Sequence, residues 1–157
     1  MEKMPMTPAG YERLVAELKQ LKDIERPAVI RAIAEAREHG DLSENAEYHA
    51  AREKQSFIEG RVLELEDKVS RAEVIDASKM TGKTVRFGAT VTLADEDTDE
   101  EATYRIVGAD ESDINSGLLS VAAPLARALI GKEPGDSVEV TTPGGHKSYE
   151  VVKVQYK

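Results

Sequence analysis

Residues 36–48 read Ala-Arg-Glu-His-Gly-Asp-Leu-Ser-Glu-Asn-Ala-Glu-Tyr and separate two long stretches that have helical periodicity. Gly40 is well placed to end the first helix, because glycine readily adopts the left-handed conformation that closes many helices. The second helix is expected to open directly afterwards. Two helices joined by so short a connection must lie antiparallel. This stretch therefore predicts the tip of an α-helical hairpin.

The first arm of the predicted hairpin begins at Thr7-Pro8, an N-cap residue followed by proline at the first helical position. Pro27 should kink this helix or divide it in two, because proline lacks the N–H group that a helix interior uses. Apolar residues recur at spacings of three and four, as in one stripe along a helix. The stripe comprises Tyr11, Leu14, Leu18 and Leu21, and helical spacing resumes with Ile30, Ile33 and Arg37.

The second arm carries an apolar seam in which steps of four and three alternate, the pattern of a heptad coiled coil. Near the turn the apolar residues of both arms are mostly alanine, so the tip should be slim. Each arm has roughly 30 residues, which at the helical rise gives a rod on the order of 45 Å long. Such a rod suits insertion into a partner. The seam residues are Ile58, Val62, Leu65, Val69 and Ala72.

From about Lys79 the pattern changes to short runs of β-branched and alternating residues bounded by turn signals. Pro124 to Ile130 reads as a short helix. We therefore expect an α+β fold: an N-terminal antiparallel coiled-coil hairpin, then a small antiparallel sheet domain with one helix. The predicted boundaries are 1–76 for the hairpin, 77–82 for a linker and 83–157 for the globular domain. The predicted strands are residues 84–87, 89–93, 103–107, 118–121, 137–140 and 149–154.

Composition excludes several classes of function. The chain has 157 residues, a net charge of -9 and no cysteine. Without cysteine there are no disulfides, thiolate metal sites or cysteine nucleophiles. So acidic a chain is a poor candidate for holding nucleic acid through its own phosphate contacts, so a partner would have to hold it. With no apolar run of roughly 18 residues and no signal-peptide core, we expect a soluble, cytoplasmic protein that uses no membrane.

Asp41 and Glu44 are the candidate functional residues of the turn. A structural interpretation is that Asp41 and Glu44 form a capping box, or that Ser43 is the N-cap of the second helix. The functional interpretation is that acids three residues apart near a helix start lie about 5–6 Å apart at Cβ and converge on one cation. Carboxylate oxygens suit Mg²⁺, which usually shares its ligands with waters and substrate phosphates. Two carboxylates make an incomplete site, which a partner would have to complete.

The stretch Ala36–Tyr48 resembles the signature of the Gre family of bacterial transcript cleavage factors. The similarity continues through His49–Glu53 and reappears at Arg105–Gly108 and Ser120–Lys132, so it extends over essentially the whole chain. The resemblance implies that the C-terminal half is FKBP-like and docks at the mouth of the RNA polymerase secondary channel. The hairpin would enter that channel when the polymerase has backtracked and the RNA 3′ end is extruded.

The resemblance also implies roles for individual residues. Asp41 and Glu44 correspond to the catalytic acids that help to hold a Mg²⁺ and its attacking water in the polymerase. The Mg²⁺ is held mainly by the polymerase, so the chain would stimulate RNA cleavage without being a nuclease itself. Arg37 and Arg52 correspond to a small basic patch near the extruded RNA; the alternative is that they are solvated residues paired with nearby glutamates.

Three further residues are expected to support the tip. Ser43 and Asn45 either cap the second helix or order water, and Tyr48 packs beneath the turn. The acidic run Asp95–Glu101 lacks the spacing of an EF-hand and is expected to be a hairpin loop. Two alternatives to cleavage stimulation remain open: a Gre-like inhibitor that plugs the channel, and a non-catalytic polymerase-binding module. We expect a monomer.

Overall fold

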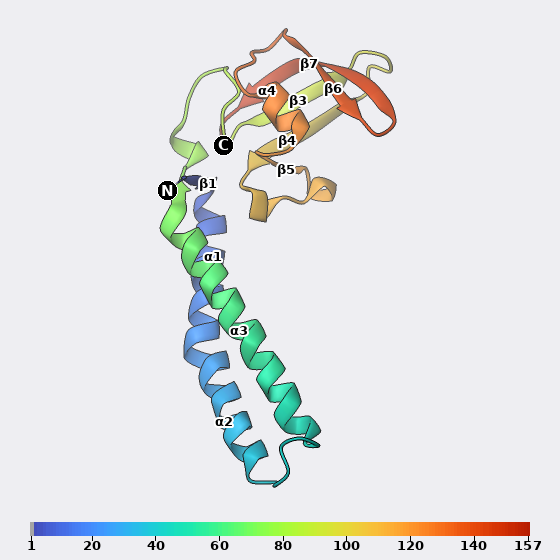
Figure 1. The fold of residues 1–157 in the computed structure, drawn as a ribbon. Helices are drawn as coiled ribbons and strands as arrows, with labels where there is room; N and C mark the ends of the chain where they lie inside the picture. Colours follow the sequence, from blue (N-terminus) through green and yellow to red (C-terminus); the bar gives the residue numbers. More distant parts are fainter. Residues whose placement is uncertain (1) are drawn as a thin grey trace. The chain divides into compact units, whose positions relative to one another are not determined.

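The computed structural model describes residues 2–157, which divide into two compact units. The first comprises residues 11–72 together with Glu2, and the second comprises residues 3–10 and 73–157. The long helices belong to the first unit and the main sheet to the second (Figure 1). Within residues 2–157, none of the helices combines the length and the hydropathy that a membrane crossing requires.

The first arm of the hairpin is divided at its proline, as predicted. Strand β1 (Met4–Met6) precedes helix α1 (Pro8–Gln20), which passes through a π-helical turn (Leu21–Glu25) into α2 (Arg26–Arg37). Pro27 lies in the first turn of α2. A proline there cannot donate a hydrogen bond to the carbonyl group four residues earlier, and the wider π turn accommodates that loss.

The second arm is α3 (Ala46–Arg71), which lies antiparallel to α2 (Figure 1). Its predicted seam is confirmed at Ile58, Val62 and Leu65, whose side chains are at most 2% exposed. The helix ends before Ala72, which begins strand β2 (Ala72–Val74). The two short strands β1 and β2 pair with each other, a feature that the sequence did not predict.

The apolar pattern predicted for α2 is confirmed at Ile33 and was wrong at Ile30 and Arg37. Ile30 is 52% exposed, whereas the residues facing α3 are Val29, Ile33 and Ala36, which are 3–7% exposed. The π turn sets the position of this seam, because a wider turn adds one residue to the repeat. A seam that would continue from Leu21 at positions 28, 32 and 35 therefore moves to 29, 33 and 36. Ile30, one residue further round the helix, then points outward.

The globular part is a small sheet with one short helix, as expected, but the sheet has five of the six predicted strands and is mixed instead of wholly antiparallel. The strands are β3 (Thr90–Asp95), β4 (Glu101–Val107), β5 (Leu118–Ser120), β6 (Ser137–Thr142) and β7 (Gly145–Gln155), in the order β5-β4-β3-β7-β6. Helix α4 (Pro124–Leu129) contributes Leu129 to the buried core. All strand pairs are antiparallel except β4–β5, which is parallel. Residues 96–100 of the acidic run form the β3–β4 hairpin loop, as predicted, and Asp95 and Glu101 end and begin the two strands. The Asp95 carboxylate accepts a hydrogen bond from the Asp97 N–H at 2.9 Å.

The strand predicted at residues 84–87 was wrong. Val85 and Phe87 are buried, but the segment is irregular. The Val85 N–H donates to the Lys132 carbonyl and the Gly131 N–H donates to the Val85 carbonyl, both at 2.8 Å. The apolar residues of this segment therefore fill the core without extending the sheet. Short 3₁₀ turns occupy Ala77–Lys79, Ala109–Glu111 and Ile114–Ser116.

A buried carboxylate in the second unit was not predicted. Glu111 is 8% exposed, and its carboxylate accepts hydrogen bonds from the Thr7 hydroxyl and from the Thr7 and Gly108 N–H groups, the latter two at 3.0 Å. Thr7 Oγ1 in turn accepts from the Gly10 N–H at 3.1 Å, which confirms Thr7 as the N-cap of α1. A Cβ atom at Gly10 would lie 2.7 Å from Glu111 Cγ, so only glycine fits there. These bonds compensate the burial of a charge and fix the first turn of α1 within this unit.

Candidate functional site

The tip loop spans residues 38–45, between the end of α2 at Arg37 and the start of α3 at Ala46. Gly40 has φ 103°, the left-handed conformation predicted for the end of the first helix. Asn45 is the N-cap of α3, because its side-chain oxygen accepts from the Tyr48 N–H at 3.0 Å. Its Nδ2 donates to the Ala36 carbonyl at 2.7 Å. One side chain thus starts the second helix and bonds to the end of the first.

Both capping interpretations of the acids and Ser43 were wrong. Asp41, Ser43 and Glu44 all precede the helix, whose cap is Asn45. The Cβ spacing expected for acids three apart on a helix does not apply to residues in a loop. The cause is that the second helix begins at Ala46 and not directly after Gly40.

Asp41 is fixed by its neighbour. Its Oδ1 accepts hydrogen bonds from the Ser43 hydroxyl at 2.7 Å and from the Ser43 N–H at 3.0 Å. These two bonds stabilise the ionised form, so they hold the pKa of the Asp41 carboxyl below its usual value. The side chain remains exposed. Asp41 is therefore a charged, oriented carboxylate on the outside of the loop.

Glu44 is exposed, and it makes no hydrogen bond or ion pair with any residue in 2–157. The two acids thus differ: Asp41 is oriented by Ser43, whereas Glu44 is free to turn. Neither carboxylate is used to cap a helix or to pair a charge. Both remain available to a partner.

Aromatic and histidine side chains surround the base of the loop. The half-buried Tyr48 ring lies 5.9 Å from the Arg37 guanidinium carbon and 5.6 Å from the His49 ring, centroid to centroid. His49 Nε2 lies 3.2 Å from the Ser43 carbonyl oxygen. His39 Nε2 lies 3.9 Å from Glu47 Oε2, a pair that is charged only when the histidine is protonated. These contacts join the loop to the first turn of α3.

Arg37 and Arg52 come from opposite arms and line one groove beside the tip. Both are exposed, and neither forms an ion pair within residues 2–157. The alternative that nearby glutamates pair with them is therefore wrong. The sequence did not reveal the other residues that line this groove, which are Ile30, Ile33, Ala34 and Gln55.

The tip alone offers few metal ligands. Among residues 2–157, no three Asp, Glu or His side chains gather as a cation site. Oxygen ligands such as those of Asp41 and Glu44 match the preference of Mg²⁺, but an ion of this kind needs about six ligands in all. The donor set therefore fits only a cation held mainly by another molecule, to which the tip would add carboxylate oxygens.

Comparison with known proteins gives two family matches, one in each half of the chain. Residues 4–74 match the family model "Transcription elongation factor, N-terminal", and residues 80–156 match "Transcription elongation factor, GreA/GreB, C-term". Transcription elongation factor GreA of Rhodospirillum rubrum is 68% identical over 156 residues, and that of Paracoccus denitrificans is 67% identical, each covering 99% of both chains. The crystal structure of GreA factor homolog 1 (Gfh1) of Thermus thermophilus is 28% identical, with a TM-score of 0.45, and covers 98% of this chain and 99% of that one.

Proposed function

The chain belongs to the GreA/GreB family of transcription elongation factors, and from that premise we propose that it stimulates the cleavage of backtracked nascent RNA by bacterial RNA polymerase. The hairpin enters the secondary channel of the polymerase, and the globular unit docks at the rim. The tip then lies at the active centre, where the RNA 3′ end is extruded. Cleavage gives a new 3′ end in register, and elongation resumes.

The availability of the tip carboxylates carries this proposal. Asp41 and Glu44 are exposed, and neither caps a helix or pairs with a cation: Asp41 bonds only to Ser43 inside the loop, and Glu44 has no partner within residues 2–157. Asn45 caps the helix in their place. Two exposed carboxylates without an ionic partner are suited to act inside another protein and not in a site of their own.

The Mg²⁺ that the polymerase holds supplies water activation and stabilises the charge that develops on the phosphate. Asp41 and Glu44 add oxygen ligands to that ion. Asp41 contributes a fixed negative charge, because Ser43 orients its carboxylate and favours ionisation. Glu44 contributes a mobile carboxylate that can turn towards the ion or towards the attacking water. The reaction belongs to the polymerase, and the factor alone is not a nuclease.

Arg37 and Arg52 hold the extruded RNA close to these acids. Their guanidinium groups have no internal carboxylate partners, and guanidinium is well suited to bind phosphate through paired hydrogen bonds. Ser43, Asn45 and Tyr48 keep the loop in shape through the contacts described above. The factor acts as a monomer in the cytoplasm.

The test is RNA cleavage by a stalled, backtracked bacterial polymerase in the presence of Mg²⁺. Wild type should stimulate cleavage, and Asp41→Asn/Glu44→Gln should lose about 100-fold or more of the stimulation while still competing with wild type for the polymerase. The matched control is Glu38→Gln/Glu53→Gln, which removes the same charge from exposed positions near the tip and should stimulate normally.

Each contrary result has a distinct meaning. Equal stimulation by wild type and by the Asp41/Glu44 variant would show that these acids take no part in the chemistry. Binding without stimulation by either protein would favour the channel-inhibitor alternative. Cleavage of the RNA without polymerase would contradict the assignment of the activity to the polymerase.

A further inference from the structure

We propose that the groove beside the tip is a binding subsite for one unstacked base of the extruded RNA. This inference rests on the proposed function and adds a recognition site for a nucleobase to it. The groove is formed by both arms of the hairpin: α2 supplies Ile30, Ile33, Ala34 and Arg37, and α3 supplies Arg52 and Gln55.

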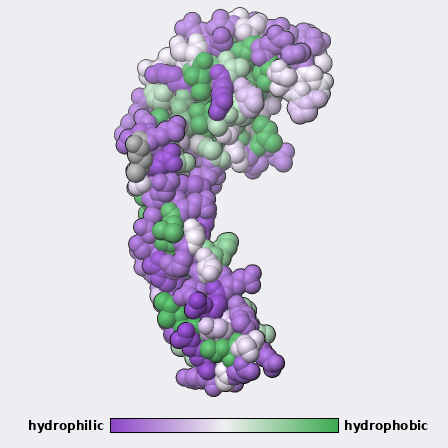
Figure 2. Space-filling view, viewed as in Figure 1, coloured by the Kyte–Doolittle hydropathy of each residue, from purple (hydrophilic) through white to green (hydrophobic). Residues whose placement is uncertain are grey.

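The apolar part of the groove can receive the face of a base. Ile30 is 52% exposed although it follows the buried Val29, because one residue further along a helix points about 100° away from the seam. Figure 2 shows that the surface of the hairpin is mostly hydrophilic, with isolated hydrophobic patches. Every nucleobase has an apolar π face, and burying that face is favourable whichever of the four bases it is. A single exposed isoleucine suits one base.

Gln55 can bind the edge of that base. Its side chain is half-buried, and its amide has no hydrogen-bond partner within residues 2–157. An amide offers both donors and an acceptor, and an unstacked base presents donors and acceptors on its Watson–Crick edge. A partly buried amide without a partner in the free protein gains a partner when a base binds.

Charge distinguishes RNA from a protein segment as the occupant. The chain carries a net charge of -9, yet the charged residues that line the groove, Arg37 and Arg52, are both cationic, and neither has an ionic partner within residues 2–157. A guanidinium without a carboxylate partner on each wall favours a ligand with regularly spaced negative charges. The phosphodiesters on either side of a flipped base meet this requirement.

The experiment measures coupling between a side chain and a base. Backtracked polymerase complexes are prepared with intact RNA, or with an abasic nucleotide at each of the first extruded positions in turn. Wild type, Ile30→Ser and Gln55→Ala are compared for affinity to each complex and for cleavage. Leu63→Ser is the matched control, since it makes the same kind of change at a residue that is 71% exposed and does not line the groove.

We expect Ile30→Ser to lower the affinity for intact complexes about threefold to tenfold, and Gln55→Ala to lower it less. An abasic nucleotide at one position should weaken wild type by a similar factor and should not weaken Ile30→Ser further. Leu63→Ser should behave as wild type on every RNA. Circular dichroism of each variant should show that the hairpin remains folded.

Additive losses at every abasic position would overturn the inference, because Ile30 would then act independently of any base. A loss of affinity in Ile30→Ser for polymerase that has no extruded RNA would also overturn it and would make the groove a protein contact. The affinity for the polymerase complexes tests the base subsite, whereas cleavage tests the proposed function, so the two can fail separately. If wild type binds and shows the coupling but does not stimulate cleavage, the subsite stands and the proposed function fails.

Discussion

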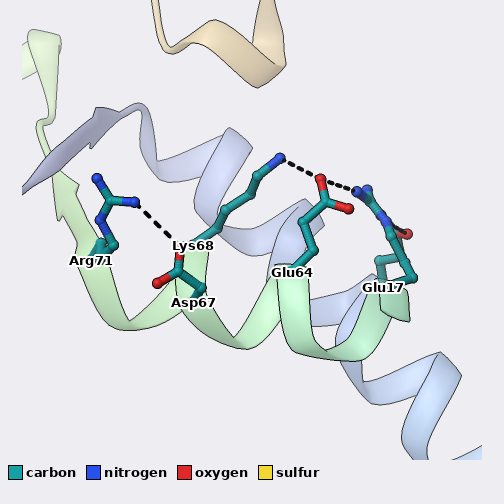
Figure 3. A network of polar contacts seen from close by, with 6 residues as sticks. Glu17, Glu64, Asp67, Lys68 and Arg71 are labelled. Carbon is teal, nitrogen blue, oxygen red and sulfur yellow. Dashed lines mark hydrogen bonds and ion pairs between the residues drawn. The ribbon is translucent and has the colours of Figure 1, made fainter. Parts of the chain in front are cut away.

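The stem of the hairpin (residues 14–26 and 58–71) and its tip (residues 36–52) contain the same kinds of charged residue but differ in ion pairing. In the stem, Arg61 pairs with Glu17 on the other arm at 2.7 Å and with Glu64 at 3.0 Å, and Lys68 also bonds to Glu64 at 3.0 Å (Figure 3). Arg26 and Glu59 join the arms in the same way, at 2.7 Å. At the tip, Arg37, Arg52 and Glu44 have no ionic partner within residues 2–157.

The difference shows which charges the fold itself uses. Hydrogen bonds from Arg61 lower the pKa of Glu17, and those from Lys68 and Arg61 lower the pKa of Glu64, so these charges are stabilised within the molecule. Arg37, Arg52 and Glu44 at the tip form no such stabilising bond to a charged residue of the other arm. Unpaired charges of both signs in one short region therefore indicate a surface that acts on something outside the chain.

The largest effect should come from breaking the apolar seam of the stem. Leu65 is fully buried, so Leu65→Ala should destabilise the hairpin by about 2–5 kcal/mol through lost burial and a residual cavity. Leu63→Ala is the control, because Leu63 is 71% exposed, and it should change stability by less than about 0.5 kcal/mol. Urea unfolding followed by far-ultraviolet circular dichroism measures both. Similar values for the two variants would show that the seam is not where the structure places it.

A smaller loss of stability is expected when Asn45, which bonds the tip loop to both arms, is replaced. Asn45→Ala removes the cap of α3 and the bond to the Ala36 carbonyl, which together should cost about 1–2 kcal/mol. Asn45→Asp keeps the acceptor for the Tyr48 N–H and should recover part of that loss. Amide hydrogen exchange at Tyr48 reports the cap directly. Wild-type exchange in Asn45→Ala would mean that another group caps the helix.

Removing an arginine that forms ion pairs should destabilise the protein more than removing one that forms none. Arg61→Ala should cost about 1 kcal/mol, because its partners Glu17 and Glu64 are 42% and 50% exposed and water screens both pairs. Arg52→Ala should change the free energy of unfolding by less than about 0.5 kcal/mol, since it has no partner to lose. Urea unfolding of the two variants measures the difference. An equal loss in both would remove the distinction between stem and tip.

The Arg61 effect should also depend on pH. The folded-state pKa of Glu17 lies below its ordinary value, so the stabilisation is complete above that ordinary value and is lost as the pH falls through the lowered one. The difference between wild type and Arg61→Ala should therefore shrink in acid. A difference that stays constant down to low pH would show that Arg61 acts through packing of its side chain alone.

Local signals predicted much of the fold. Thr7-Pro8 marked the start of α1, Gly40 the end of α2, and the heptad spacing gave the buried residues of α3. In α2 the sequence predicted the seam residue Ile33 but not Val29 and Ala36, because a proline indicates that a helix is disturbed but not that the disturbance adds a residue. The pairing of β1 with β2 and the burial of Glu111 depend on contacts between segments far apart in the chain, which periodicity does not encode.

The sequence predicted which residues lie at the tip but not how their side chains are arranged. The sequence placed Asp41 and Glu44 at the turn and Arg37 and Arg52 on its two sides, as the structure has them. It could not decide which of Asp41, Ser43 and Asn45 caps the helix, because all three are good N-cap residues. The choice depends on Asn45 being able to reach the Ala36 carbonyl on the other arm. For the same reason the groove residues Ile30 and Gln55 could be found only once both arms were in place.

The smallest expected effect concerns Asp41, the one acid of the pair that the loop orients. Ser43→Ala removes the hydroxyl donor but keeps the N–H, so the pKa of Asp41 should rise part of the way towards its ordinary value. Asp76 is an internal control, since its carboxylate accepts from the Ser78 hydroxyl and N–H at 2.6 and 3.0 Å and its lowered pKa should not move. Titration of the carboxyl carbons by nuclear magnetic resonance measures both groups. Because the folded-state pKa is lowered, any stabilisation of the loop by Asp41 is present above the ordinary pKa and lost as the pH falls through the lowered one. If the Asp41 titration is unchanged in Ser43→Ala, the Ser43 hydroxyl does not hold the carboxylate in solution, and only the backbone N–H at residue 43 is left to orient Asp41.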